Sequence, residues 1–263
     1  MLLEAKNVSK VYRSRRSSGT VQAVKDATLS ARPGEFIAIV GESGSGKSTL
    51  ARILLDLIPP STGSVELDGT RISSLRGERY RGYRRLVQAV LQDPAGSLNP
   101  RKSVERTIGE VIRLHGIART RPDVRARVLE VLELVGMSPA QPFLDRYPHE
   151  LSGGQRQRVL IARAISLDPR IIVADEAVSA LDASVKAGVL RVMVDLKDRL
   201  GVGYVFITHD LPLVQKVADY VYVMRAGEIV EQGPKDQIFS APQHPYTQTL
   251  LAAAPVLRRR SSL

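Results

Sequence analysis

Residues 41–48 combine glycine, serine and a lysine in an order that suits the binding of phosphate groups. The segment reads Gly-Glu-Ser-Gly-Ser-Gly-Lys-Ser, which fits the pattern GxxxxGK[ST] between an apolar run and an amphipathic one. Glycine lets the backbone curl so that successive N–H groups face phosphate oxygens, and the N-terminal end of the next helix adds positive charge. Lys47 supplies a full charge for the β- and γ-phosphates, and the Ser48 hydroxyl suits Mg²⁺. The expected nucleotide ligands in this segment are Gly41, Ser43, Gly44, Gly46, Lys47, Ser48 and Thr49.

A second group of residues that could do chemistry is the acidic pair Asp175 and Glu176, which ends the apolar run Ile171–Ala174. The run predicts a buried strand, and the carboxyl ends of parallel strands form the ligand-binding edge of a sheet. An acid at that edge lies beside the phosphate loop. We therefore expect Asp175 to hold Mg²⁺, and Glu176 to orient the attacking water or act as its general base.

The third motif is LSGGQ at residues 151–155, which precedes a run with helical spacing. Ser152 can cap that helix, and the free N–H groups at its start then form an anion site that needs no lysine. Together with the phosphate loop and the acidic pair, the motif resembles the ATP-binding subunits of ABC (ATP-binding cassette) transporters, over roughly residues 2–250. In that family the motif binds the γ-phosphate of ATP held by the opposite subunit. The resemblance implies that a nucleotide on another cassette is contacted by Ser152, Gly153, Gly154 and Gln155.

Single residues elsewhere match the family pattern and take their roles from the resemblance alone. Tyr12 lies where an aromatic ring stacks on adenine, and Gln92 where a glutamine reaches Mg²⁺ and water and responds to the membrane partner. Asp182 belongs to the loop through which the two sites of a dimer communicate, and His209 matches the histidine that contacts the γ-phosphate. The predicted catalytic residues are Glu176, His209 and Gln92, and the predicted Mg²⁺ ligands are Ser48, Gln92 and Asp175.

Two further segments narrow the resemblance to one subfamily. Residues 92–101 and 242–247 resemble the importers of oligopeptides, dipeptides and nickel, in which the ATPase usually pairs with a related subunit. The sequence around Glu176 is nearer to the second type of ATPase subunit than to the first. Ala177 stands where proline is commoner, which leaves Glu176 in place. The cysteines that hold an iron–sulfur cluster in some relatives are missing, so that cluster cannot form here.

The resemblance implies an ATP-hydrolysing motor subunit of an importer, with ATP and Mg²⁺ as cofactors and di- or oligopeptides as cargo. A nickel or metal-chelate importer is the open alternative. The implied partners are two transmembrane permease subunits, a second ABC ATPase subunit and an extracellular solute-binding protein, with no nucleic acid.

Other ABC proteins fit less well. Repair ATPases that act on DNA carry a long coiled-coil insertion between the phosphate loop and LSGGQ, and translation factors that act on ribosomes carry two cassettes in tandem. Here each motif occurs once, and the stretch between Lys47 and Leu151 is too short for such an insertion. Exporter cassettes are often fused to a membrane domain, and the longest apolar runs of this sequence are only strand-sized.

The motifs require an α/β fold whose strands deliver the functional loops to one edge. Strands that alternate with helices imply a mostly parallel sheet, and the central helical block indicates an inserted α-helical sub-domain. The resemblance to ABC ATPases implies that the sheet belongs to a P-loop NTPase core with an N-terminal antiparallel β part. We divide the chain into a RecA-like nucleotide-binding core (1–96 and 159–234), an α-helical signature sub-domain (97–158) and a C-terminal extension of the peptide-importer type (235–263). The expected strands are Leu2–Val8, Val21–Ser30, Glu35–Val40, Val65–Leu67, Ile171–Ala174, Tyr204–Ile207, Tyr220–Met224 and Ile229–Gln232. The expected helices follow the phosphate loop and cover Pro122–Gly136 and Gly153–Leu167.

Composition limits the remaining possibilities. The 263 residues are 43% hydrophobic and 25% charged, as in ordinary globular proteins, and the absence of cysteine excludes disulfide scaffolds, cysteine-bound metal and thiol catalysis. The net charge of +11 is spread over runs at 13–16, 79–85, 119–127 and 258–260. These runs lack interleaved aromatic residues, so solvated faces or contact with anionic lipid are favoured over nucleic acid. The N-terminus has no leader pattern, and we expect a peripheral protein at the cytoplasmic face of the membrane.

Overall fold

A six-stranded, mostly parallel sheet forms the centre of the described part of the chain, which comprises residues 1–13, 19–91 and 94–253 of the computed structural model. Its strands are β3 (Phe36–Val40), β6 (Val87–Val90), β7 (Ile171–Asp175), β8 (Gly203–Ile207), β9 (Tyr220–Arg225) and β10 (Glu228–Pro234). They lie in the order β10-β9-β3-β8-β7-β6. All neighbours run parallel except β9 and β10, which form an antiparallel hairpin. The predicted parallel core is confirmed.

Three of the four inner strands, β3, β7 and β8, are buried along their whole length. Successive side chains of a strand point to opposite faces of the sheet. In β3, Ile37 and Ile39 belong to one apolar cluster, whereas Phe36, Ala38 and Val40 belong to another. Because both faces are covered, these strands read in the sequence as unbroken apolar runs rather than as an alternation.

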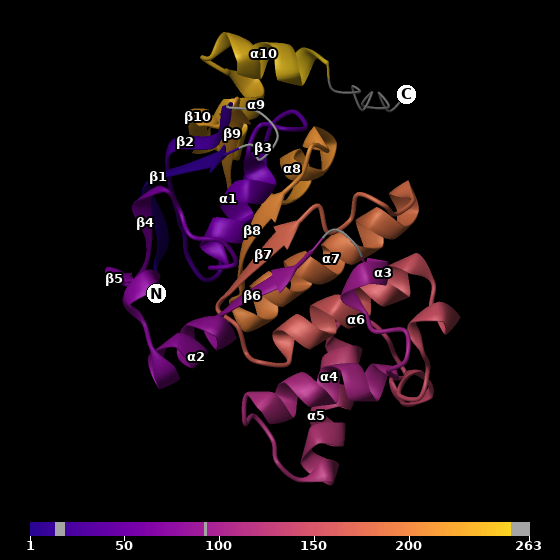
Figure 1. Cartoon of the computed structure of the whole chain (residues 1–263). Coiled ribbons are helices and arrows are strands. Elements are labelled where there is room, and N and C mark those ends of the chain that lie inside the picture. The colour runs from indigo at the N-terminus through magenta and orange to yellow at the C-terminus, as the bar shows by residue number, and fades with distance from the viewer. Residues whose placement is uncertain (14–18, 92–93, 254–263) are drawn as a thin grey trace, which may run out of the picture.

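A smaller antiparallel sheet and the first helix, α1 (Lys47–Leu54), pack on one face of the central sheet. The sheet has the order β2-β1-β4-β5, and Figure 1 shows its indigo and purple strands beside α1. This is the predicted N-terminal antiparallel part. Its strands are β1 (Leu3–Arg13), β2 (Thr20–Ala31), β4 (Thr62–Leu67) and β5 (Thr70–Arg71).

Helices cover the opposite face and extend into a separate lobe. In Figure 1, α4, α5 and α6 lie together at the far end of the molecule from α10. The helices after α1 are α2 (Gly77–Leu86), α3 (Pro94–Ser97), α4 (Val104–Leu114), α5 (Arg121–Leu134), α6 (Gly153–Ile165), α7 (Ala183–Leu200), α8 (Leu211–Val217), α9 (Lys235–Ser240) and α10 (Pro245–Ala252). Short 3-10 helices lie at Ile72–Ser74, Gln141–Phe143 and Pro148–Glu150.

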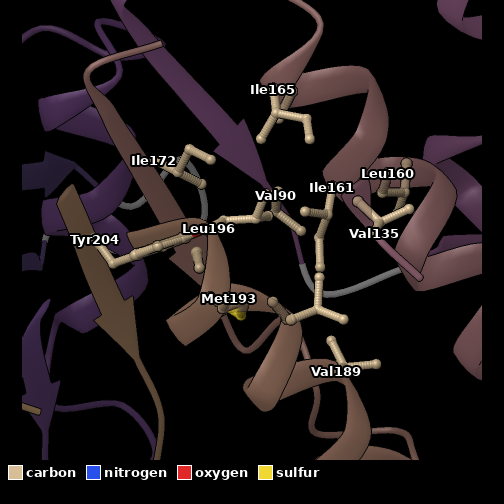
Figure 2. Packing of buried hydrophobic residues seen from close by; sticks show 14 of the residues in the cluster. Val90, Val135, Leu160, Ile161, Ile165, Ile172, Val189, Met193, Leu196 and Tyr204 are labelled. Atoms are coloured by element: carbon tan, nitrogen blue, oxygen red, sulfur yellow. The ribbon is translucent and has the colours of Figure 1, made fainter. Parts of the chain in front are cut away.

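The helical lobe and the central sheet share one apolar cluster. Ile161 and Ile165 of α6, Met193 and Leu196 of α7 and Ile172 of β7 belong to this cluster, and Figure 2 shows Ile172 on the left, on the side of Leu196. Helix α6 therefore joins the two parts. The division at residues 158 and 159 that the sequence suggests lies inside this helix, and it remains a prediction.

The sequence did not predict helix α7, which is the longest helix among the described residues. It has 18 residues, but its buried side chains begin only at Val189, so its first two turns carry no apolar stripe. None of the helices described has both the length and the apolar character needed to cross a lipid bilayer.

Two of the basic runs take part in packing. Arg85 Nε donates a hydrogen bond to Leu167 O (3.0 Å), and Arg127 Nε donates one to Ser166 O (3.4 Å), so both guanidinium groups bind the loop that follows α6. These arginines donate hydrogen bonds to carbonyl groups at the C-terminal end of a helix, where the helix dipole makes positive charge favourable. Of the other two runs, residues 14–16 and 258–260 lie outside the described part of the chain.

Candidate nucleotide site

The phosphate loop connects β3 to α1 and has backbone packed against it from two other strands. A Cβ atom on Gly41 would lie 2.1 Å from the carbonyl oxygen of Met224 in β9, and one on Gly46 would lie 2.2 Å from that of Ala23 in β2. Only glycine fits at these positions, and both have positive φ angles (150° and 103°) that favour glycine. The glycines that the motif requires therefore also let β2 and β9 support the loop.

Lys47 points into this loop. Its Nζ donates hydrogen bonds to Gly41 O (2.8 Å), Glu42 O (2.7 Å) and Ser45 Oγ (3.2 Å). The side chain is buried, and burial lowers the pKa of the ammonium group, while the nearby carboxylates of Glu176 and Asp175 act in the opposite direction. An anion inside the loop would stabilise the charged form, so the position suits a phosphate ligand.

Ser48 and Asp175 come from different elements and meet at the carboxyl edge of the sheet. Ser48 Oγ donates a hydrogen bond to Asp175 Oδ1 (3.1 Å). The pKa of the Asp175 carboxyl is raised by burial and by Glu176, and the hydrogen bond from Ser48 and the charges of Arg52 and Lys47 counteract this. A cation at this point would favour the ionised carboxylate.

This pair of oxygens fits the Mg²⁺ site that the sequence predicts. Adjacent ligands of an octahedral Mg²⁺ ion lie about 2.9 Å apart, close to the separation of these two oxygens. Among the described residues there is no cluster of three or more histidine, cysteine or acidic side chains that could hold a metal alone. Such a cluster is not needed, because Mg²⁺ in phosphate sites takes few protein ligands and completes its shell with phosphate oxygens and water.

Glu176 follows β7 and lies beside His209. The distance between Glu176 Oε1 and His209 Nδ1 is 3.3 Å, as expected for two groups at the ends of neighbouring strands. Glu176 has a left-handed backbone (φ 47°), which costs a non-glycine residue about 1 kcal/mol. Its N–H donates to Ile207 O (2.9 Å) and its carbonyl accepts from Ser179 N (3.1 Å), so the neighbouring backbone holds this conformation. The backbone of Glu176 is thereby fixed beside the end of β8.

The LSGGQ segment starts helix α6 with a capping box. Ser152 Oγ accepts a hydrogen bond from Gln155 N (3.2 Å), and Gln155 Oε1 accepts one from Ser152 N (2.9 Å). A Cβ on Gly154 would lie 2.5 Å from Val185 Cγ1, so glycine allows α6 to approach α7 closely. The cap uses the N–H of Gln155, and the N–H groups of Gly153 and Gly154 lie at the start of the helix, where they have no acceptor within it and can bind an external anion.

The phosphate loop and the signature segment belong to different regions of the chain. Figure 1 shows α1 among the strands and α6 with α4 and α5. Within the described residues no hydrogen bond or ion pair joins residues 152–155 to residues 41–48. Within one chain the two segments are therefore separate.

The remaining predicted residues are more exposed. The Tyr12 side chain lies near the end of β1 and is 40% exposed, and Lys10 Nζ lies 5.5 Å from its ring centroid. Asp182 is the exposed N-cap residue of α7, and its side chain makes no capping hydrogen bond. Gln92 lies outside the described residues, so its predicted roles remain predictions.

Two residues that touch the phosphate loop were not predicted. Gly227, in the turn between β9 and β10, donates its N–H to Ser45 O (3.0 Å). The Tyr246 hydroxyl, from α10, accepts a hydrogen bond from Glu42 N (3.1 Å) across 204 positions of sequence. The turn and the segment around Tyr246 are both visible in the sequence, but no local pattern shows where they fold to.

Comparisons with known proteins agree with this geometry. Residues 24–179 match the ABC transporter family, and residues 230–263 match the C-terminal region of oligopeptide/dipeptide transporters. The glutathione import ATP-binding proteins GsiA of Salmonella paratyphi A and of Escherichia coli K12 are both 46% identical over 241 residues, which is 92% of this chain and 38% of theirs. The chain thus spans well under half the length of these relatives.

Solved structures with the same fold include the dimeric cassette MJ0796 in a post-hydrolysis state bound to ADP and Pi (TM-score 0.76, 29% identity, 89% of this chain and 98% of that chain). Another is cbiO1 from Clostridium perfringens, part of the ABC transporter complex cbiONQ (TM-score 0.77, 27% identity, 91% of this chain and 90% of that chain). The predicted fold and subfamily resemblance are confirmed. The chain belongs to the ABC transporter family, as an ATP-binding cassette that carries the C-terminal region of the oligopeptide/dipeptide transporters.

Proposed function

We propose that this chain is the ATP-hydrolysing motor subunit of an ABC importer for di- or oligopeptides. The observation that carries the proposal is the gathering of Lys47, the Ser48–Asp175 pair and the Glu176–His209 pair at one edge of the central sheet. The match to the oligopeptide/dipeptide C-terminal region and the GsiA relatives, which import the tripeptide glutathione, supports a peptide as cargo. The chain would act at the cytoplasmic face of the membrane, against two permease subunits.

ATP binding would use the phosphate loop and the exposed aromatic ring. The backbone N–H groups of residues 43–49 and the Lys47 ammonium group would receive the phosphate oxygens, and Tyr12 would stack on adenine. Ser48 and Asp175 would hold Mg²⁺, with Gln92 as a further ligand. When bound, Mg²⁺ would neutralise charge on the β- and γ-phosphates.

Hydrolysis would depend on positioning more than on covalent chemistry. The Glu176 carboxylate would orient the attacking water and accept its proton, while His209 contacts the γ-phosphate and fixes the Glu176 side chain at 3.3 Å. Attack in line with the leaving ADP then needs only alignment and charge neutralisation.

A second cassette would complete each site. The N-terminus of α6, capped by Ser152, would approach the γ-phosphate bound by the partner, so that two ATP molecules are enclosed between two opposed chains. The dimeric form of MJ0796 supports such an arrangement, and the subfamily resemblance favours a related second subunit over an identical one. Closure of the dimer would move the helical lobe, and with it the permease subunits.

The role of Ser48 in metal binding can be tested by Ser48→Ala. Loss of one of the two protein oxygens should raise the Mg²⁺ concentration needed for half-maximal ATPase activity by about tenfold or more. The measurement is a Mg²⁺ titration of the initial rate at fixed ATP. Ser166→Ala is the control, since Ser166 is also a hydrogen-bonded serine but its Oγ donates to Arg163 O (2.8 Å) at the end of α6. An unchanged Mg²⁺ requirement in Ser48→Ala would remove Ser48 from the metal site.

The proposed function can be tested on the membrane complex that contains this chain. The complex, reconstituted in liposomes with its solute-binding protein, should take up labelled di- or oligopeptides only when Mg²⁺ and ATP are supplied on the side of this subunit. Uptake of Ni²⁺ chelates but not of peptides would identify the nickel alternative. An ATPase rate that responds to DNA or ribosomes, in a chain that joins no permease, would contradict the proposal.

A further inference from the structure

The segment Pro242-Gln243-His244-Pro245-Tyr246 folds into a built support for the start of α10. The Glu231 carboxylate, on β10, accepts hydrogen bonds from Gln243 N (2.7 Å) and His244 N (3.1 Å). His244 Nδ1 in turn accepts one from Tyr246 N (3.1 Å) and so caps the helix, and Pro245 occupies the first helical turn, where no N–H is required. Each of these contacts helps to fix the start of α10, and with it the position of the Tyr246 side chain.

The Tyr246 side chain connects this segment to the phosphate loop. The side chain is 6% exposed, and its hydroxyl accepts the hydrogen bond from Glu42 N (3.1 Å). The guanidinium carbon of Arg225 lies 4.9 Å from the centroid of the ring. Arg225 ends β9, and the turn that follows it donates the N–H of Gly227 to Ser45 O (3.0 Å). Tyr246 and the β9–β10 turn both lie in the C-terminal part of the chain, and each forms a hydrogen bond with the phosphate loop.

The contact fixes the orientation of one peptide group. The peptide between Gly41 and Glu42 directs its carbonyl oxygen to Lys47 Nζ (2.8 Å) and its N–H to the Tyr246 hydroxyl (3.1 Å). Rotation of this peptide would break both hydrogen bonds at once. It would also move the carbonyl that helps to place the Lys47 ammonium group. Tyr246 thus acts on the lysine through a single intervening peptide.

We propose that Tyr246 is a positioning residue of the nucleotide site, through which the C-terminal region holds the phosphate loop in its binding conformation. The proposal rests on the nucleotide site described above and adds the C-terminal region to it. A loop that is already ordered loses less conformational freedom when ATP binds, so the contact should raise affinity. Since Tyr246 does not reach the reacting atoms through any described contact, it should affect binding more than the chemical step.

Removal of the hydroxyl alone tests this role. In the full-length chain, Tyr246→Phe keeps the ring beside Arg225 but leaves Glu42 N without its acceptor. We expect the Kd for MgATP, and the KM for ATP, to rise about three- to tenfold, as for loss of one hydrogen bond, with kcat within about twofold of the original. The Kd is measured by titration calorimetry, and the kinetic constants by phosphate release.

Tyr222→Phe is a matched control. Tyr222 is 5% exposed, and its hydroxyl also accepts a hydrogen bond from a backbone N–H, that of Ser30 (3.2 Å), away from the phosphate loop. It should leave the Kd for MgATP unchanged, even if it lowers the melting temperature as much as Tyr246→Phe does. Equal weakening of ATP binding by both variants would overturn the proposal, since the effect would then come from general loss of stability.

A second variant, Glu231→Ala, tests the same contact indirectly, through the segment that supports Tyr246. Glu231→Ala removes the acceptor of two hydrogen bonds that hold residues 243 and 244, and should also weaken MgATP binding. The double variant Tyr246→Phe/Glu231→Ala should bind MgATP no more weakly than the single variant with the larger effect, because both substitutions act through one contact. Additive effects, or an unchanged Kd in Tyr246→Phe while Lys47→Ala abolishes binding, would overturn the role of Tyr246 and leave the nucleotide site intact. Absence of MgATP binding in the unaltered chain would overturn both.

Discussion

Replacement of Glu176 by glutamine should remove most ATP turnover and leave ATP binding intact. Glutamine has the same shape and can keep a hydrogen bond to His209, which lies at 3.3 Å, but its amide cannot accept a proton from water. Loss of a general base typically lowers the rate by about 10²–10⁴-fold. Because bound ATP is no longer hydrolysed, the closed dimer should accumulate, and size-exclusion chromatography with ATP should reveal it.

Glu66→Gln provides the comparison for this experiment. Glu66 lies on β4 and pairs with Lys6 (2.7 Å), so the same chemical change occurs away from the phosphate loop. That variant should hydrolyse ATP at the original rate. Hydrolysis at the original rate by Glu176→Gln would show that another group activates the water, and the mechanism proposed above would have to be abandoned.

The second large effect is expected for Gly41→Ala. The added Cβ would lie 2.1 Å from the carbonyl oxygen of Met224, and the residue would keep a φ of 150° that alanine rarely adopts. Met224 cannot easily retreat, because it pairs with Ile229 in the β9–β10 hairpin. We expect a loss of about 3 kcal/mol in the free energy of unfolding, together with at least about tenfold weaker ATP binding, because the loop must shift. Urea denaturation and ATP titration measure the two quantities.

Gly69→Ala separates steric crowding from backbone strain. Gly69 also has a positive φ (76°), but a Cβ there would meet nothing within 4 Å. It should therefore cost only about 1 kcal/mol and leave ATP affinity unchanged. If Gly41→Ala behaved like Gly69→Ala in both measurements, close packing of β9 against the phosphate loop would not be what requires glycine at position 41.

The chemistry of each individual motif can be predicted from a short segment of the sequence. In the phosphate loop, glycine spacing decides which backbone shapes are possible, and the capping box of Ser152 and Gln155 spans only four consecutive residues. The apolar runs of β3 and β7 predict buried strands because a strand covered on both faces has no polar positions to alternate with. Interactions over a few residues depend on local residue types, so a single sequence is enough to predict them.

What joins the motifs into one site depends on strand order. Glu176 reaches His209 because β7 and β8 are neighbours, and Tyr246 reaches Glu42 because the β9–β10 hairpin brings the C-terminal region to the side of β3. Helix α7 likewise has few local signals in its first turns and is held by packing against α6. The sequence by itself determined which chemical groups the protein offers and the local shapes that present them. Only the tertiary structure decided which distant groups meet, because burial of apolar surface is non-directional and many strand orders would bury the same residues.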